Sequence, residues 1–182
     1  MPSLFLTTDR LVLRDFKISD WQRIHRYASD PEVVKFMDWG PNTVDETKDF
    51  VRMAITFQRD NPRRHFDLAV VTKPEDCLIG GCGIYVTSPH NREAFIGYCL
   101  SRDSWGQGYA TEAAKRLLSF GFTQLKLHRI FATCDPLNLA SAKVLEKCGM
   151  QFEGRLRENK LIGQKWRDSV VYAILEHQWN PK

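Results

Sequence analysis

The chain has 182 residues and a formal net charge of +4, with 43% hydrophobic and 26% charged residues. These values are those of a globular domain with a sizeable core, and they exclude a chain that is disordered by composition. No apolar run is long enough to span a bilayer, and the opening "MPSLFLTTDRLVLRDF" is unlike a signal or transit peptide, so we expect a cytoplasmic protein without a membrane partner.

The first third of the chain predicts one strand followed by helices. Apolar residues alternate with arginines in "TDRLVLRDF", which is typical of a strand. "SDWQRIHRYAS" predicts a helix with Ser19 as its N-cap, and "DPEVVKFM" predicts a short helical turn that begins at Pro31. A further helix is expected from about Thr43 or Asp45 to Gln58, where "DNPRR" ends it.

The rest of the chain predicts a sheet interrupted by two helices. Three strand-like segments, "HFDLAVVT", "CLIGGCGIYVT" and "AFIGYCLS", precede a long helix whose apolar residues recur at helical spacing from Ala110 to Gly121. "HRIFATCD" reads as a strand, and a helix from about Leu139 ends at Gly149, a natural C-terminal cap. "QFEGRLRENKL" and "WRDSVVYAILEHQW" are the last two strands. The order β-α-α-β-β-β-α-β-α-β-β without a linker predicts one α+β domain over residues 1–182, with a mixed sheet.

The turn "WGQGYATEA" joins the end of a strand to the start of a helix. The first N–H groups of a helix have no intrahelical partner, and the helix dipole there favours negative charge. Gly106 and Gly108 let the backbone approach a phosphate without a Cβ in the way, although many such turns hold no ligand. The patterns GxGxxG and GxxxxGK[ST] are both absent, which disfavours an NAD enzyme or an NTPase.

Two polar residues begin the next helix. Asn138 and Ser141 are three apart, so their side chains point to one side. A helix cap would explain Asn138 fully, and Ser141 would be tolerated as a small residue. Five scattered cysteines without a CxxC predict reduced thiols, and five histidines without HxH or HExxH spacing give no support for a metal site.

These segments together resemble the GNAT superfamily of acetyl-CoA-dependent N-acetyltransferases, and within it the branch of the bacterial ribosomal-protein N-terminal acetyltransferases. The resemblance covers nearly the whole chain, from "TDRLVLRDF" through "LIGGCGIY" and "IGYCLSRDSWGQGYATEA" to "HRIFATCDPLNLASAKVLEKCGMQFEG". Its most specific feature is the Gly-rich turn followed, in order, by "NxxSxxVLEKxG". It implies a single-domain α+β fold with a mixed, mostly antiparallel sheet flanked by helices.

The resemblance also implies a site for acetyl-CoA as co-substrate, without a metal. The pantetheine arm would pair with the backbone at the end of the "IGYCL" strand, where a β-bulge would aim an N–H at the oxyanion. Asn138 would contact the pantetheine, Ser141 would lie near the sulfur, and the amides of the turn would bind the pyrophosphate. The residues implied in cofactor binding are Cys99, Leu100, Trp105, Gly106, Gln107, Gly108, Tyr109, Ala110, Thr111, Asn138 and Ser141.

Two positions depart from the family pattern and bear on catalysis. The tyrosine acid that many relatives carry seven residues after the asparagine is Leu145 here, so Ser141, with Tyr98, is the candidate partner of the leaving thiol. Where relatives in this branch often read "AEIGY", Phe95 replaces the carboxylate. Glu93, two residues earlier on the same strand face, is a candidate base, although an exposed strand-end charge is the plainer explanation.

The acceptor side is implied to form from "MDWGPNT" and "RENKLIGQKWRD". Trp39 and Trp166 are candidates to line it, although core packing would also explain them, and Asp38 is a candidate to hold an ammonium group or to cap its loop. A protein N-terminal α-amine is the leading acceptor.

Several alternatives stay open. The acceptor could instead be a small-molecule amine such as a polyamine, amino acid or antibiotic. The missing tyrosine and glutamate allow a catalytically silent acyl-CoA-binding module. The positive charge with "RRH" and "RLRENK" allows an RNA- or ribosome-binding protein, although no direct nucleic-acid binding is expected. Both a monomer and a homodimer are compatible with the sequence.

Overall fold

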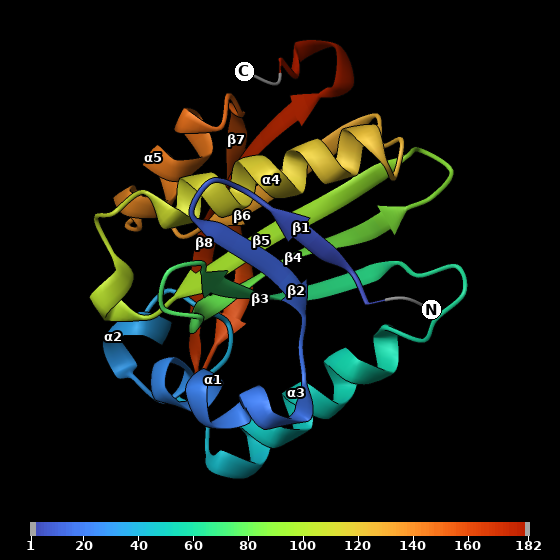
Figure 1. Cartoon of the computed structure of the whole chain (residues 1–182). Coiled ribbons are helices and arrows are strands. Elements are labelled where there is room, and N and C mark those ends of the chain that lie inside the picture. Colours follow the sequence, from blue (N-terminus) through green and yellow to red (C-terminus); the bar gives the residue numbers. More distant parts are fainter. Residues whose placement is uncertain (1–2, 181–182) are drawn as a thin grey trace.

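One eight-stranded sheet runs through the computed structural model, which describes residues 3–180 (Figure 1). The strands lie in the order β1-β2-β3-β4-β5-β6-β8-β7, and β5 and β6 are the one parallel pair in this sheet. Their bounds are β1 Phe5–Thr7, β2 Leu11–Asp15, β3 His65–Thr72, β4 Cys77–Ser88, β5 Glu93–Leu100, β6 Arg129–Cys134, β7 Gln151–Ile162 and β8 Lys165–Leu175.

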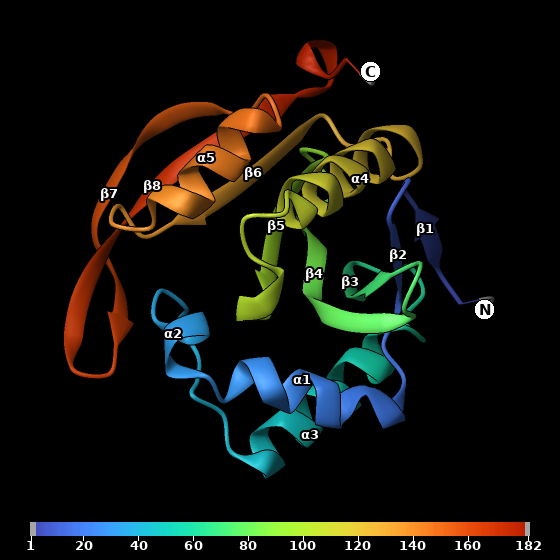
Figure 2. The same cartoon turned by 60° about the vertical axis from the view of Figure 1, so that its left-hand side comes forward.

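The helices cover both faces of the sheet (Figure 2). Helices α4 and α5 lie on one face, and α1, α2 and α3 lie on the other. Their bounds are α1 Trp21–Ala28, α2 Pro31–Val34, α3 Val44–Phe57, α4 Tyr109–Thr123 and α5 Leu139–Lys147. The expected mixed α+β architecture is confirmed.

Each face of the sheet has its own hydrophobic core. Leu68 and Ile96 belong to the core under α4, whereas Ala69 and Val71 belong to the core under α1 and α3. This division follows from the alternation of side chains along a strand. The apolar stripe predicted for α4 is buried, and its fully buried members are Ala113, Ala114, Leu117, Leu118 and Gly121.

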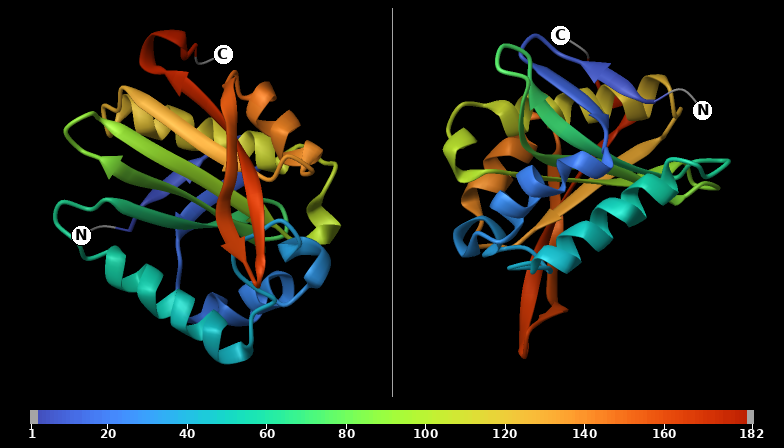
Figure 3. Two further views of the ribbon diagram at one scale, coloured as in Figure 1. Left: turned by 180° about the vertical axis from the view of Figure 1, so that it is seen from behind. Right: turned by 60° about the horizontal axis from the view of Figure 1, so that its bottom comes forward.

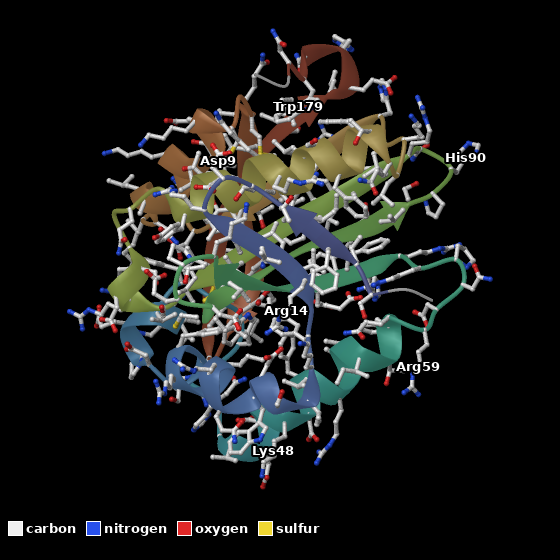
Figure 4. All side chains as sticks on the ribbon, viewed as in Figure 1. Asp9, Arg14, Lys48, Arg59, His90 and Trp179 are labelled. Carbon is white, nitrogen blue, oxygen red and sulfur yellow. The ribbon has the colours of Figure 1, made fainter. Side chains whose placement is uncertain are left out.

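Three local predictions were wrong or incomplete. Strand β1 was missed because three residues carry too little pattern. Ser19 is not the N-cap of α1, because a 3₁₀ turn, Ile18–Asp20, precedes the helix. The carboxylate of Asp20 instead accepts hydrogen bonds from Lys17 N and from the guanidinium of Arg14, which Figure 4 labels.

The third incorrect prediction is the β-bulge that was expected at the end of β5. Pairing with β4 is continuous from Gly80↔Leu100 to Val86↔Ala94, so β5 has no bulge there. The irregularity lies on β4, where Ile79 is the extra residue opposite β3.

Strands β5 and β6 diverge soon after they meet. They pair only from Glu93↔Arg129 to Phe95↔Phe131, so the second half of β5 has no strand on that side. The β7–β8 hairpin projects past the rest of the sheet toward the side of α2 (Figures 2 and 3). The divergence of β5 and β6 therefore leaves a gap in the sheet next to the projecting β7–β8 hairpin.

Candidate active site

A cavity of about 1160 Å³ lies where β5 and β6 diverge. One part is lined by the end of β5, the Gly-rich turn and the start of α5. The other part is lined by α1, α2 and α3, by β3 and β4, and by the β7–β8 hairpin. Of the predicted cofactor-binding residues, all except Gln107 line this cavity.

The Gly-rich turn has the geometry of an anion site. Gly106 and Gly108 have φ values of +74° and +79°, a left-handed conformation that strongly favours glycine. Within residues 3–180, the backbone N–H groups from 106 to 111 donate no hydrogen bond to the protein. A Cβ added at Gly106 would meet no atom within 4 Å. These amides at the N-terminus of α4 are therefore free to bind a diphosphate.

The turn is held from behind by the segment before β2. The guanidinium of Arg10 donates to the carbonyl of Gln107 at 3.0 Å and pairs with Glu112 of α4 at 2.6 Å. Its plane also lies over the ring of Tyr109, 4.5 Å from the centroid. Gln107 turns its side chain away, to the carbonyl of Asp103. The loop is thereby fixed through side chains, and its amides are left free.

The free edge of β5 offers a second set of backbone groups. Ser101 N donates to Ile79 O on β4. Backbone groups alternate in direction along a strand, so the N–H and C=O groups of Cys99, two residues earlier, also point to β4. The N–H and C=O groups of Tyr98 and Leu100 therefore point the other way, into the gap toward β6. The indole of Trp105 donates to Leu100 O at 2.9 Å, which leaves the Leu100 amide available.

The first turn of α5 faces this edge. Asn138 is the N-cap of α5, because its Oδ1 accepts from Ser141 N at 3.1 Å, and it lines the cavity as well. The hydroxyl of Tyr98 lies 3.0 Å from Ser141 Oγ and 3.2 Å from Ser141 O. Burial raises the pKa of Tyr98 well above its usual value, while the hydrogen bond with Ser141 acts in the opposite direction. Tyr98 stays protonated and can donate to Ser141.

Glu93 is not brought to this site. It is not among the residues that line the cavity, and its carboxylate pairs with Arg129 at 2.9 Å. It shares a strand face with Phe95, as predicted, but two residues along a strand carry it about 7 Å away. Leu145, at the position of the missing tyrosine, is buried.

The acceptor side differs in detail from the sequence expectation. Trp39 and Asp38 line the cavity, and Asp38 is paired with Lys160 of β7 at 2.7 Å. Trp166 is exposed on the hairpin and does not line it. Sequence reasoning missed Asp67, a buried carboxylate on β3 that faces this part of the cavity. The one acid in the apolar segment "HFDLAVVT" was its signal.

Two further classes of site find no support in residues 3–180. No cluster of three or more histidine, cysteine or acidic side chains could hold a metal ion there. None of the helices in this range combines the length and apolarity needed to cross a membrane.

Comparisons with known proteins agree with this geometry. The family model described as "Acetyltransferase (GNAT) domain" matches residues 10–151. An uncharacterized N-acetyltransferase of Bacillus subtilis, YnaD, is 38% identical over 97% of this chain and 100% of its own length. The ribosomal protein uS5-alanine N-acetyltransferase of Escherichia coli is 27% identical over 100% of this chain and 95% of its own. The crystal structure of a GNAT-family acetyltransferase from Bacillus anthracis superposes with a TM-score of 0.85, at 34% identity, covering 96% of this chain and 99% of the other.

Proposed function

The chain belongs to the GNAT family of acetyltransferases, and we propose that it transfers the acetyl group of acetyl-CoA to a primary amine, with a protein N-terminal α-amine as the leading acceptor. The observation that carries the proposal is the row of free amides from 106 to 111, which opens into the same cavity as the free edge of β5.

Acetyl-CoA would bind along these two features. The amides of the turn would hold the pyrophosphate, and the backbone of Tyr98 and Leu100 would pair with the pantetheine arm as a neighbouring strand does. The side-chain amide of Asn138 would reach the arm while its oxygen caps α5. Acetyl-CoA supplies an acetyl group activated as a thioester.

The transfer needs four things from the protein: proximity, an oxyanion donor, protonation of the leaving sulfur and removal of the amine proton. A C–N bond forms as the neutral amine attacks the carbonyl carbon, and the C–S bond breaks. The Leu100 amide would donate to the developing oxyanion. Ser141 would give its proton to the leaving sulfur and recover one through the hydroxyl of Tyr98, 3.0 Å away, which would in turn take a proton from solvent. The amine proton leaves through the acceptor side of the cavity.

Support for a protein acceptor comes from the relative that modifies ribosomal protein uS5. A small-molecule amine is the second candidate, because the buried carboxylate of Asp67 lines the acceptor side of the cavity and could hold a charged amine. We further propose that the reaction takes place in the cytoplasm, since all five cysteines are free, as suits a reducing compartment.

The test is acetyl-CoA binding by calorimetry, combined with thiol release in the presence of N-terminal peptides and small amines. Tight binding with acceptor-dependent thiol release is expected. Binding without thiol release on any acceptor would favour the silent acyl-CoA module. Salt-dependent RNA binding that persists in Gly108→Trp, without acetyl-CoA binding by the wild type, would favour the nucleic-acid alternative.

A further inference from the structure

Asp67 is a buried carboxylate that forms no salt bridge in the described part of the chain, although the charges of Arg63 and His65 act on it from a greater distance. It is 6% exposed, and it forms no ion pair within residues 3–180. The other two buried aspartates differ, because Asp15 pairs with Arg63 and Asp20 pairs with Arg14, both at 2.7 Å. A carboxylate removed from water is costly unless it is paired. Asp67 lines the cavity, so a positively charged group bound in the cavity can pair with it.

One oxygen of Asp67 is held and the other is free. The hydroxyl of Tyr85 donates to Oδ1 at 2.6 Å. Within the described residues Oδ2 accepts no hydrogen bond, yet it is not sealed off as a buried unsatisfied atom. Tyr85 reaches Asp67 by lying across Gly83 of its own strand, where any Cβ would collide with the hydroxyl. The glycine makes this arrangement possible.

The hydroxyl of Tyr27 is a second polar group that lines the same cavity. Tyr27 of α1 is 5% exposed, and its hydroxyl has no hydrogen-bond partner among residues 3–180. It lies over Gly81, where an added Cβ would be 3.2 Å from the hydroxyl oxygen. Aromatic side chains, among them Phe16 and Phe57, line the same chamber. Carboxylate and hydroxyl oxygens amid aromatic rings are suited to an ammonium or guanidinium group.

The distance between Asp67 and the thioester decides whether a cation bound at Asp67 can be the amine that is acetylated. Asp67 pairs with Gly83, and Gly83 pairs with Gly97 of β5. Strand β5 is two strand spacings from Asp67 and the gap for the thioester lies just beyond β5, so the thioester would be two to three spacings, roughly 10 to 14 Å, from Asp67. A group bound at Asp67 is therefore too far away to be the amine that attacks the thioester.

We propose that Asp67 recognises a second positive charge on the acceptor, carried about 10 to 14 Å from the amine that is acetylated. This inference rests on the proposed function and names its substrate class: an amine with a remote ammonium or guanidinium group. A linear diamine or polyamine would supply that charge, and so would a lysine or arginine side chain near a peptide N-terminus.

The first experiment measures binding to the CoA-loaded protein by calorimetry. We expect the wild type to bind diaminooctane at least about tenfold more tightly than octylamine, which corresponds to about 1.4 kcal/mol. Diaminopropane should bind no more tightly than propylamine, because its second ammonium group is too close to the first to reach Asp67. This comparison of chain lengths needs no variant. Equal affinity for diaminooctane and octylamine, together with no effect of lysine in the peptides below, would overturn the proposal.

The second experiment uses two variants. Asp67→Asn keeps the shape and an oxygen for Tyr85 but removes the charge, so the diamine preference should disappear. Asp38→Asn removes the rival carboxylate at the rim, which is already paired with Lys160. If the preference survives in Asp67→Asn, or is lost in Asp38→Asn instead, the assignment to Asp67 is wrong.

Peptides separate the two sources of the charge. Thiol release is compared for Ala-Gly-Lys-amide and Ala-Gly-norleucine-amide. A preference for lysine that vanishes in Asp67→Asn identifies a peptide side chain, and a preference confined to the diamines identifies a small molecule. Acetyl-CoA binding is measured separately in each variant. Its absence from the wild type would count against the proposed function, whereas intact binding with no charge preference would count against Asp67 alone.

Discussion

The hydroxyl of Tyr98 lies 3.0 Å from Oγ of Ser141, and this contact joins β5 to α5 across the gap between β5 and β6. Both side chains line the cavity. A hydroxyl that is itself hydrogen-bonded by a second hydroxyl is oriented and has a source from which to recover its proton.

Replacing Ser141 by Ala should lower kcat by about a hundredfold and leave the acetyl-CoA dissociation constant nearly unchanged, because the lost group acts on the leaving sulfur. Tyr98→Phe should lower kcat by about tenfold through the same serine. Steady-state thiol release and calorimetry measure the two quantities. The double variant should be no worse than Ser141→Ala, and additive losses would show that the two hydroxyls act independently.

Gly106 can be tested against a matched glycine. Gly106 and Gly163 both have positive φ, +74° and +63°, and an added Cβ meets nothing within 4 Å at either. Replacement by Ala should cost each variant about 1 kcal/mol of stability through backbone strain. Only Gly106→Ala should also weaken acetyl-CoA binding, by about tenfold, because its Cβ would lie in the turn whose amides we propose to bind the diphosphate. Equal dissociation constants in the two variants would remove the turn from the binding site.

Arg10 should support acetyl-CoA binding without touching the reacting atoms. Arg10→Met removes the side-chain contacts to Gln107 and Glu112 and loosens the turn, so the acetyl-CoA dissociation constant should rise by about fivefold while kcat stays close to the wild-type value. Arg52→Met, which breaks an exposed pair with Asp49 on α3, is the matched control. An equal effect of both replacements on affinity would point to net charge instead of the loop.

Asp67 should make stability depend on pH. Burial raises the pKa of its carboxyl, although the hydrogen bond from Tyr85 and the charges of His65 and Arg63 lower it in part. Between the unfolded-state pKa, about 3.9, and the raised folded-state pKa, the native state binds more protons than the unfolded state. Stability from this group therefore falls as pH rises through that window.

Asp67→Asn should consequently have a higher Tm than the wild type at pH 8, and the difference should shrink as the pH approaches 4. Thermal unfolding across this range measures it. The interactions of Asp67 with the charges of His65 and Arg63 are lost together with the carboxylate, so they are part of the measured difference. A pH-independent difference would mean that the carboxyl does not titrate differently in the folded state.

The sequence was most informative where the chemistry is local. The turn around Gly106 and Gly108 and the cap at Asn138 lie within short segments, and helix termini have recognisable residue patterns. In the structure both glycines have left-handed backbone and Asn138 caps α5, the role that the sequence offered as the alternative to a ligand contact. The face of α4 that packs on the sheet was equally readable, because its period is intrinsic to the helix.

Contacts between distant segments could not be read in this way. Tyr85 and Asp67 are 18 residues apart and meet only through the register of β3 and β4 and the absence of a side chain at Gly83. Glu93 is the converse case, a residue that was predicted to lie in the site and lies outside the cavity. The strand period put it on the correct face, but the end of the cavity along β5 depends on where β6 departs, which no local pattern encodes.

The short pairing of β5 with β6 also has a mechanical consequence. The strands from β1 to β5 and those from β6 to β8 form two halves of the sheet, and only the pairs from Glu93↔Arg129 to Phe95↔Phe131 bridge them directly. A substrate arm that hydrogen-bonds in the remaining seam acts as a temporary ninth strand. Each catalytic cycle would then stiffen the seam when acetyl-CoA binds and loosen it when CoA leaves, so the sheet would be complete only while the cofactor is bound.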